Sequence, residues 1–118
     1  MRKLSKKEVS TFLKKAYRFF KDKRNQLLFK KLPKEKSRSK KKHRLVTVMG
    51  KYDCDGYNET ISVDYRYEIV PSIIHETLHA LHEKWTEKKV YKEEKRYLKS
   101  LTQKQALNLL RCFLDNLR

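Results

Sequence analysis

Glycine, proline and cysteine are scarce in this sequence of 118 residues, which holds two of each. A β-sandwich needs a turn about every 8–12 residues and usually spends more glycine and proline on those turns, so a purely β fold is not expected. Cys54 and Cys112 lie far apart and lack the CxxC spacing of a zinc ribbon. We therefore expect two free thiols and no disulfide framework.

Long apolar runs are also missing. No stretch approaches the roughly 18 consecutive apolar residues that a membrane span requires. The N-terminus starts with basic residues, as a secretory signal does, but Lys14, Lys15 and Arg18 interrupt any apolar region and no small-residue cleavage site follows. These absences predict a cytoplasmic protein with no membrane partner.

Positive charge is abundant and unevenly distributed. The net charge is +17, and 38% of the residues are charged. Residues 1–44 hold 19 Lys and Arg against three acidic residues, whereas residues 45–118 hold 12 against 11. This division predicts a basic helical N-terminal segment and loop (1–44) followed by a nearly neutral core (45–118). A basic half of this kind indicates a polyanionic partner, and non-specific DNA or RNA binding through residues 1–44 is the first choice.

Hydrophobic periodicity indicates helices at both ends of the chain. Residues 6–20 carry apolar side chains at helical spacing, with Ser5 and Glu8 as a capping box. A second apolar cluster (Leu27, Leu28, Phe29 and Leu32) extends this helix or forms another short one, and residues 33–43 form an exposed loop. Residues 71–85 and 87–99 predict two further helices. A final helix follows Thr102, with Gln105 completing its cap and seven apolar residues packing inward: Ala106, Leu107, Leu109, Leu110, Phe113, Leu114 and Leu117.

Two strands are expected between the helices. Residues 45–49 are rich in β-branched side chains and end at Gly50, and residues 60–65 alternate between apolar and polar. Turn residues separate the two segments, so they can pair as an antiparallel hairpin. The predicted fold is therefore α+β, with an N-terminal helix, a small antiparallel sheet and three C-terminal helices.

His75, Glu76 and His79 form an HExxH motif inside the most apolar predicted helix. Histidines at i and i+4 project from one helix face, so both imidazoles can reach one zinc ion at about 2.0–2.1 Å. The zinc ion lowers the pKa of its water toward about 7 and polarises a scissile carbonyl. Glu76 follows the first histidine and accepts the proton of the attacking water. These residues predict a Zn²⁺-dependent peptidase with Glu76 as its catalytic base.

A catalytic zinc site needs a third protein ligand. The position six residues after His79 is Trp85, so the three-histidine pattern fails. The remaining choice is an acid from the next helix. We expect Glu94, because it shares a face with Val90, Tyr97 and Leu98, and Glu93 on the more solvated side is the second choice.

The segment from His75 to Leu117 resembles gluzincin-type zincins, in particular small prokaryotic and phage metallopeptidases of the SprT-like and ImmA-like kind. The matching features are the HE-x-x-H-A helix (His75 to Ala80), a Val-x-x-x-Glu segment (Val90 to Glu94) and a terminal helix (Thr102 to Leu117). The resemblance implies a zincin-like fold, a protein or peptide substrate, and an edge strand at Thr60 to Tyr65 that aligns this substrate. It also implies a second electrophilic group, for which Tyr91, Tyr97 and His82 are all open.

Two other functions remain open. The first is a basic nucleic-acid-binding protein with a structural zinc, although structural sites are usually rich in cysteine and neither cysteine lies near the motif. The second is a regulatory zincin that binds metal and cleaves nothing. The N-terminal helix can also act as a segment that blocks the cleft.

Overall fold

The computed structural model describes residues 3–33, 35–36, 45–46, 49–56, 58–66 and 68–117. Over these residues the fold is α+β, with four helices and a small three-stranded mixed sheet. The helices are α1 (Lys6–Lys21), α2 (Ile69–Leu81), α3 (Glu87–Ser100) and α4 (Gln103–Asp115). The sheet has the strand order β1 (Gln26–Phe29), β5 (Glu59–Val63), β4 (Gly50–Cys54). A second pairing joins β2 (Glu35–Lys36) to β3 (Leu45–Val46).

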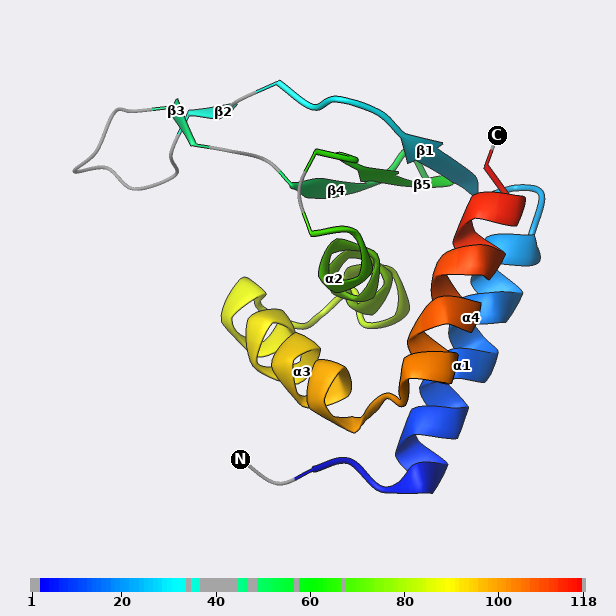
Figure 1. The fold of residues 1–118 in the computed structure, drawn as a ribbon. Helices are drawn as coiled ribbons and strands as arrows, with labels where there is room; N and C mark the ends of the chain where they lie inside the picture. Colours follow the sequence, from blue (N-terminus) through cyan, green and yellow to red (C-terminus); the bar gives the residue numbers. More distant parts are fainter. Residues whose placement is uncertain are drawn as a thin grey trace.

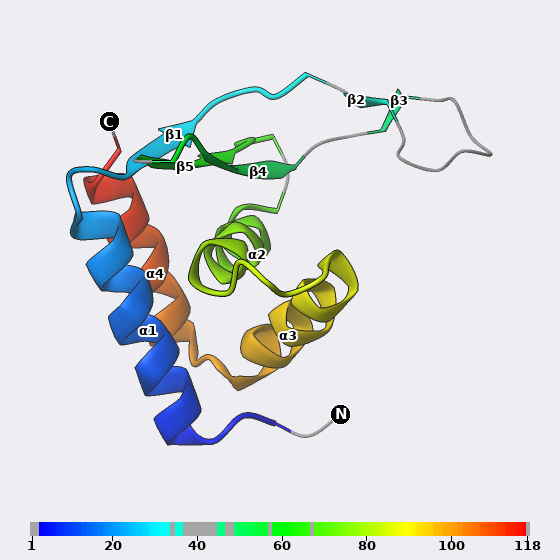
Figure 2. The ribbon, with the colours of Figure 1, turned by 180° about the vertical axis from the view of Figure 1, so that it is seen from behind.

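Helix α2 lies at the centre of the molecule (Figures 1 and 2). The sheet covers one side of α2, α3 packs beside it, and α1 and α4 run side by side along the remaining flank. Because eight of its thirteen residues are buried, α2 has almost no solvated face. Among the described residues, no helix combines the length and the apolar character needed to cross a bilayer.

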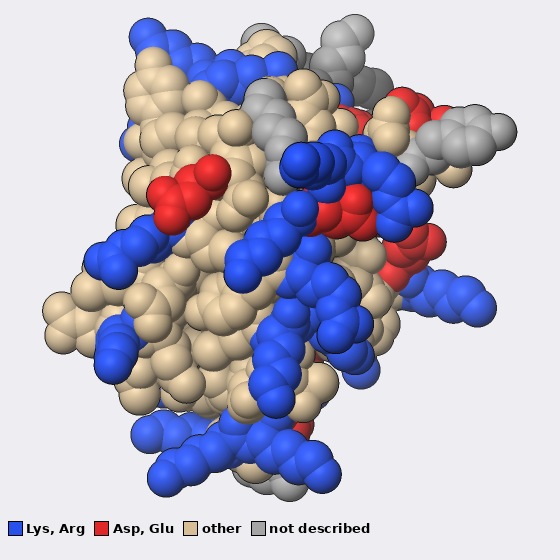
Figure 3. All heavy atoms as spheres, turned by 90° about the vertical axis from the view of Figure 1, so that its right-hand side faces the viewer, with Lys and Arg blue, Asp and Glu red and all other residues tan. Residues whose placement is uncertain are grey.

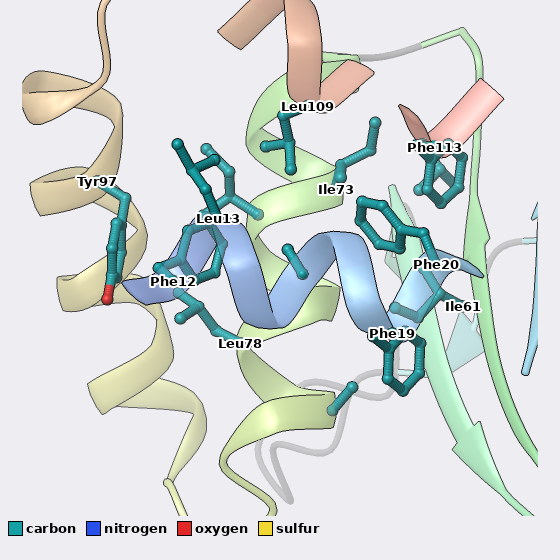
Figure 4. Packing of buried hydrophobic residues seen from close by; sticks show 14 of the residues in the cluster. Phe12, Leu13, Phe19, Phe20, Ile61, Ile73, Leu78, Tyr97, Leu109 and Phe113 are labelled. Atoms are coloured by element: carbon teal, nitrogen blue, oxygen red, sulfur yellow. The ribbon is translucent and has the colours of Figure 1, made fainter. Parts of the chain in front are cut away.

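One hydrophobic core joins all four helices to the sheet. Phe20 of α1 packs edge-on against Phe113 of α4, with ring centroids 5.5 Å apart, and Phe12 contacts Tyr97 of α3 (Figure 4). Leu27 of β1 is fully buried in the same cluster. The basic segment 1–44 therefore supplies a helix and a strand to the core that residues 45–118 share.

The helix boundaries largely follow the sequence predictions. The capping boxes of Ser5 with Glu8 and of Thr102 with Gln105 are confirmed. Helix α2, however, begins at Ile69 after the N-cap Glu68, two residues before the expected start, and it ends at Leu81, four residues before the expected end at Trp85. In α4, only Leu109 and Phe113 are buried, and three of the leucines expected to pack inward are exposed: Leu107, Leu114 and Leu117.

The expectation of a helix in residues 27–32 is wrong. Residues 26–29 form β1, which pairs in parallel with β5 so that Leu27 faces Ile61. An apolar run this short has no periodicity that separates a strand from a helix, and the pairing with β5 decides between them.

An antiparallel hairpin is present, but the prediction of its first strand is wrong. β5 pairs with β4, which starts at Gly50, where the first strand was expected to end. Leu45 and Val46 of the predicted strand form β3, which pairs with β2 instead. Residues 47–48 lie outside the described residues, as do Lys34 and residues 37–44 of the predicted loop. The segment 60–65 is not an edge strand, because β5 lies between β1 and β4.

Candidate metal centre

The HExxH motif lies in the buried middle of α2. His75 and Glu76 are each 7% exposed, and their neighbours Ile74 and Leu78 are fully buried. The two imidazole rings of His75 and His79 lie one helical turn apart, with centroids separated by 4.9 Å. The helix therefore holds both rings on one side, facing α3.

Glu87 bridges the two histidines. Its Oε1 lies 2.6 Å from Nε2 of His75, and its Oε2 lies 2.8 Å from Nε2 of His79. Glu87 is the first residue of α3, and Thr86 caps this helix by accepting a hydrogen bond from the backbone N–H of Lys89. The cap fixes where α3 starts, and this start sets the Glu87 carboxylate against α2.

The ligand atoms of His75, His79 and Glu87 all lie within 4.8 Å of one another. Two imidazoles and one carboxylate are donors that zinc accepts, and such a set leaves a fourth position open. The residues present therefore fit a catalytic type of zinc site better than a closed one. Cys54 and Cys112 are free thiols outside this group.

Glu94 contacts His75 from the other side of the ring. Its Oε1 lies 2.9 Å from Nδ1 of His75. Glu94 follows Glu87 by seven residues, two helical turns, so both carboxylates project from the same side of α3. Burial lowers the pKa of His75, but the hydrogen bond to Glu94 and the charges of Glu76 and Glu87 outweigh it, so the pKa is raised. The pKa of His79 is lowered, chiefly by burial.

Glu76 lies under the first residue of β4. A Cβ atom on Gly50 would lie 2.9 Å from both Cγ and Oε2 of Glu76, so only a glycine leaves room for this carboxylate. Burial raises the pKa of Glu76 to about 7, with the charge of His75 opposing and those of Glu87 and Glu94 adding to the rise. Glu76 is thus enclosed by α2 and β4.

A cavity of about 230 Å³ opens at this point, between β4, α2 and α3. Among the described residues that line it are four glutamates and no lysine or arginine: Glu68, Glu76, Glu87 and Glu94. In a chain of net charge +17, this is a local concentration of negative charge. A divalent cation compensates such charge, which is consistent with the donor set.

The structure brings together every residue of the main site prediction, namely His75, Glu76, His79 and Glu94. It separates Glu93 from them, because Glu93 pairs with Arg96 at 2.9 Å and lines a different cavity. The side-chain environments on α3 were nevertheless assigned incorrectly. Glu93 is buried and Leu98 is exposed, since the buried side of α3 follows Val90, Glu93 and Tyr97.

Sequence reasoning missed Glu87. An acid at the first position of a helix is common, because it interacts favourably with the helix dipole, and that ordinary role hid the residue. One signal was available: Glu87 lies two turns before Glu94 on the same face of α3.

Of the three candidates for a second electrophilic group, only Tyr91 lies at the site. Its ring is 4.6 Å from that of His75, and it lines the cavity. Tyr97 packs against Phe12 in the core, and His82 stacks on Trp85 with centroids 3.7 Å apart. Burial raises the pKa of Tyr91, and the charges of Glu87 and Glu94 add to the rise, so its hydroxyl keeps its proton.

Comparison with known proteins gives no relative: no family model, no curated protein and no solved structure matches this chain. The chemistry of the site therefore carries the functional argument.

Proposed function

We propose that this protein is a zinc-dependent peptidase, with a zincin-like core, in which His75, His79 and Glu87 hold the metal. The observation that carries the proposal is the pair of contacts from one Glu87 carboxylate to Nε2 of both histidines, beside the buried Glu76. A bound zinc ion would supply Lewis-acid polarisation of the scissile carbonyl and a water of lowered pKa. The free thiols are consistent with the reducing cytoplasm that the sequence predicts.

Glu76 acts as the general base in this proposal. Its carboxylate takes a proton from the attacking water and later delivers it to the leaving amine. Gly50 leaves the space that this carboxylate occupies beside β4, and both residues line the cavity.

Glu94 and Tyr91 have supporting roles. Glu94 fixes the ring of His75 through Nδ1, the arrangement by which a carboxylate orients a ligating histidine. This role replaces the ligand role that the sequence predicted for Glu94. The Tyr91 hydroxyl donates a hydrogen bond to the carbonyl oxygen as negative charge develops on it.

Strand β4 is the surface on which we expect a peptide to lie. Among the described strands, β4 pairs only with β5, so its other edge is available to an extended peptide. Gly50 at the start of β4 lines the cavity. A peptide paired with β4 thus passes over Glu76. In this proposal β4 aligns the substrate, the role that the resemblance implied for residues 60–65.

The first test is the zinc content of the purified, unchelated protein, measured by elemental emission. We expect one zinc per chain, with zinc lost in His79→Ala. Glu76→Gln should retain zinc and lose cleavage of fluorescein-labelled casein. A protein that contains no zinc and takes up none on addition contradicts the proposal.

The ligand assignment is tested by three glutamine variants of α3. Glu87→Gln should lose zinc, and Glu94→Gln should weaken zinc affinity by about 10- to 100-fold, as expected for a residue that orients a ligand. Glu93→Gln is the matched control and should retain full affinity. Zinc loss in Glu94→Gln with retention in Glu87→Gln would restore Glu94 as the ligand.

The second candidate function is a nucleic-acid-binding protein whose metal site is not catalytic. The net charge of +17 favours it. The variant Glu76→Gln distinguishes the two functions. It abolishes cleavage if the protein is a peptidase, and it changes no activity if the protein only binds nucleic acid.

A further inference from the structure

The outer side of α1 is a row of cations. Lys7, Lys14, Arg18 and Lys21 are all exposed. Their spacings of seven, four and three residues place them on one side of the helix, opposite the buried Val9, Phe12, Leu13 and Ala16. Over fourteen residues this row extends about 21 Å.

Helix α4 adds two further cations beside the row on α1. Lys104 and Arg111 are exposed on α4, which packs along α1. Lys21 lies close enough to Cys112 to oppose the rise in its pKa that burial causes, so the end of the row meets α4. We call Lys7, Lys14, Arg18, Lys21, Lys104 and Arg111 the basic face; Figure 3 shows this side of the molecule, where blue side chains far outnumber red ones.

The charge of the basic face is not compensated locally. Within the part of the chain that the structure describes, none of its six side chains forms an ion pair. The only acidic residues of α1 and α4 are Asp115 and Glu8, which accepts a hydrogen bond from the backbone N–H of the N-cap Ser5. Six like charges held on two rigid helices attract a polyanion without any rearrangement of the protein.

We propose that the basic face binds the phosphate backbone of duplex nucleic acid without reading its sequence. The row on α1 matches the rise of about six base pairs at 3.4 Å each. Between its cations lie Ser10 and Thr11, whose exposed hydroxyls can donate hydrogen bonds to phosphate oxygens.

A lipid surface fits the α1 row less well. Helices that lie in a bilayer interface insert apolar side chains next to their cations. On α1 the apolar side chains point into the core, and the solvated side offers only hydroxyls and cations. The α1 row therefore favours nucleic acid. On α4 the exposed Leu107 lies between Lys104 and Arg111, so a vesicle is included in the test.

The basic face lies on the far side of α2 from the cavity. α1 and α4 cover one flank of α2, and α3 and β4, which enclose the cavity, lie on the others (Figure 1). Bound nucleic acid would therefore leave the cavity open. Binding does not depend on the proposed peptidase, and Glu76→Gln should bind nucleic acid as the unmodified protein does.

The experiment compares two variants of equal charge. One replaces Lys7, Lys14, Arg18 and Lys21 by Gln. The matched control replaces Lys88, Lys92, Lys95 and Lys99, an equally exposed lysine row on α3, by Gln. Glutamine keeps a good helix propensity, so both variants should retain the circular dichroism spectrum of the unmodified chain.

Binding to a fluorescein-labelled 20-base-pair duplex of random sequence is measured by anisotropy over a range of salt concentrations. The unmodified chain should show a slope of log K against log salt of about −5 or steeper, from six or more phosphate contacts. The α1 variant should flatten this slope by about 3 to 4 and weaken binding at least tenfold at low salt. The α3 control should keep the slope. An RNA duplex in parallel distinguishes the two sources of phosphate backbone.

Three outcomes overturn the proposal. Equal losses in the α1 and α3 variants would mean that total charge, and not the basic face, attracts the duplex. Retained binding in the α1 variant, with loss on replacing Lys40, Lys41, Lys42 and Arg44 by Gln, would assign binding to the basic segment before β3. Binding to phosphatidylserine vesicles but to neither duplex would assign the face to membranes.

Discussion

Gly50 and Glu76 approach each other more closely than any larger residue at position 50 would permit. In Gly50→Ala, the new methyl group would lie 2.9 Å from Oε2 of Glu76, so the carboxylate or the strand must move. Because a displacement of about 1 Å at a reacting group can cost on the order of 10²-fold in rate, we expect casein cleavage to fall by about that factor. Zinc content should be unchanged, since the three atoms nearest to the new methyl group all belong to Glu76 and not to a proposed ligand.

Cys54→Ala is the control for this prediction, because Cys54 is exposed at the other end of β4. The control should cleave casein at the original rate. Full activity in Gly50→Ala would show that the position of Glu76 is not critical.

Thr77, inside the HExxH motif, presents a hydroxyl with no function in the fold. Its side chain is fully buried, and among the described atoms Oγ1 has no hydrogen-bond partner. Thr77→Val replaces an unsatisfied hydroxyl by a methyl group of the same shape, so the free energy of unfolding should rise by about 1 kcal/mol. Urea unfolding followed by circular dichroism measures the change.

Ser72 is the opposite case on the same helix. Its Oγ donates a hydrogen bond to the backbone carbonyl of Glu68 at 2.7 Å. Ser72→Ala removes that bond and should lower the free energy of unfolding by about 1 kcal/mol. If both variants shifted stability in the same direction, hydrogen-bond satisfaction would not be the cause.

At the scale of elements, Asp64 ties the end of β5 to the segment after β1. Its buried carboxylate accepts hydrogen bonds from the backbone N–H of Leu32 at 2.7 Å and from the guanidinium of Arg66. The hydrogen bond from Arg66 holds the pKa of Asp64 well below its usual range, with the Leu32 N–H adding to this effect against the opposing effect of burial.

A lowered pKa means that the folded protein prefers the charged form of Asp64. Its contribution to stability is present above the unfolded pKa of about 3.9 and is lost as the pH falls toward the folded value. Asp64→Asn should therefore lower the urea midpoint at pH 7, and the difference from the unmodified protein should shrink below about pH 4. Asp22→Asn, at the more exposed pair with Arg24, should change little at any of these pH values. A difference that stays constant between pH 5 and pH 2 would contradict the charge argument.

Helices that depend only on residues close together in the sequence could be predicted. α1 and α4 carry both the periodicity and a capping box, and both were located within a residue or two. β1 could not be predicted, because its state depends on β5, more than thirty residues later. The start of β4 at Gly50 depends on the same kind of distant contact, since Gly50 is required by Glu76 and not by a turn.

The site shows the same limit. His75, Glu76 and His79 lie within five consecutive residues of α2, so their spacing alone brings them together. Glu94 could be inferred from the next helix, but Glu87 depends on how the loop of residues 82–86 sets α3 against α2. The stacked pair of His82 and Trp85 occupies that loop, with the Lys89 ammonium group 5.0 Å from the centroid of the Trp85 ring. Such packing carries no periodic signal in a sequence.

For the whole molecule, the charge division of the sequence does not correspond to a division of the core. Phe20 from the basic segment is fully buried against Phe113, and Leu27 pairs with Ile61. The basic half is basic only on its solvated side, and its buried side completes the core around α2. Residues 1–44 and 45–118 should therefore unfold together.

Unfolding in urea tests this expectation with two probes. The only tryptophan, Trp85, reports on the loop between α2 and α3, and circular dichroism reports on all helices. The two transitions should coincide, as in a two-state protein. Phe20→Ala empties a fully buried site between α1 and α4 and should lower the free energy of unfolding by about 3–5 kcal/mol. Both probes should report the same loss, because Phe20 and Trp85 belong to one hydrophobic core. A tryptophan transition that stays in place while the circular dichroism transition moves would show that α1 unfolds separately from α2 and α3, which carry the proposed metal ligands.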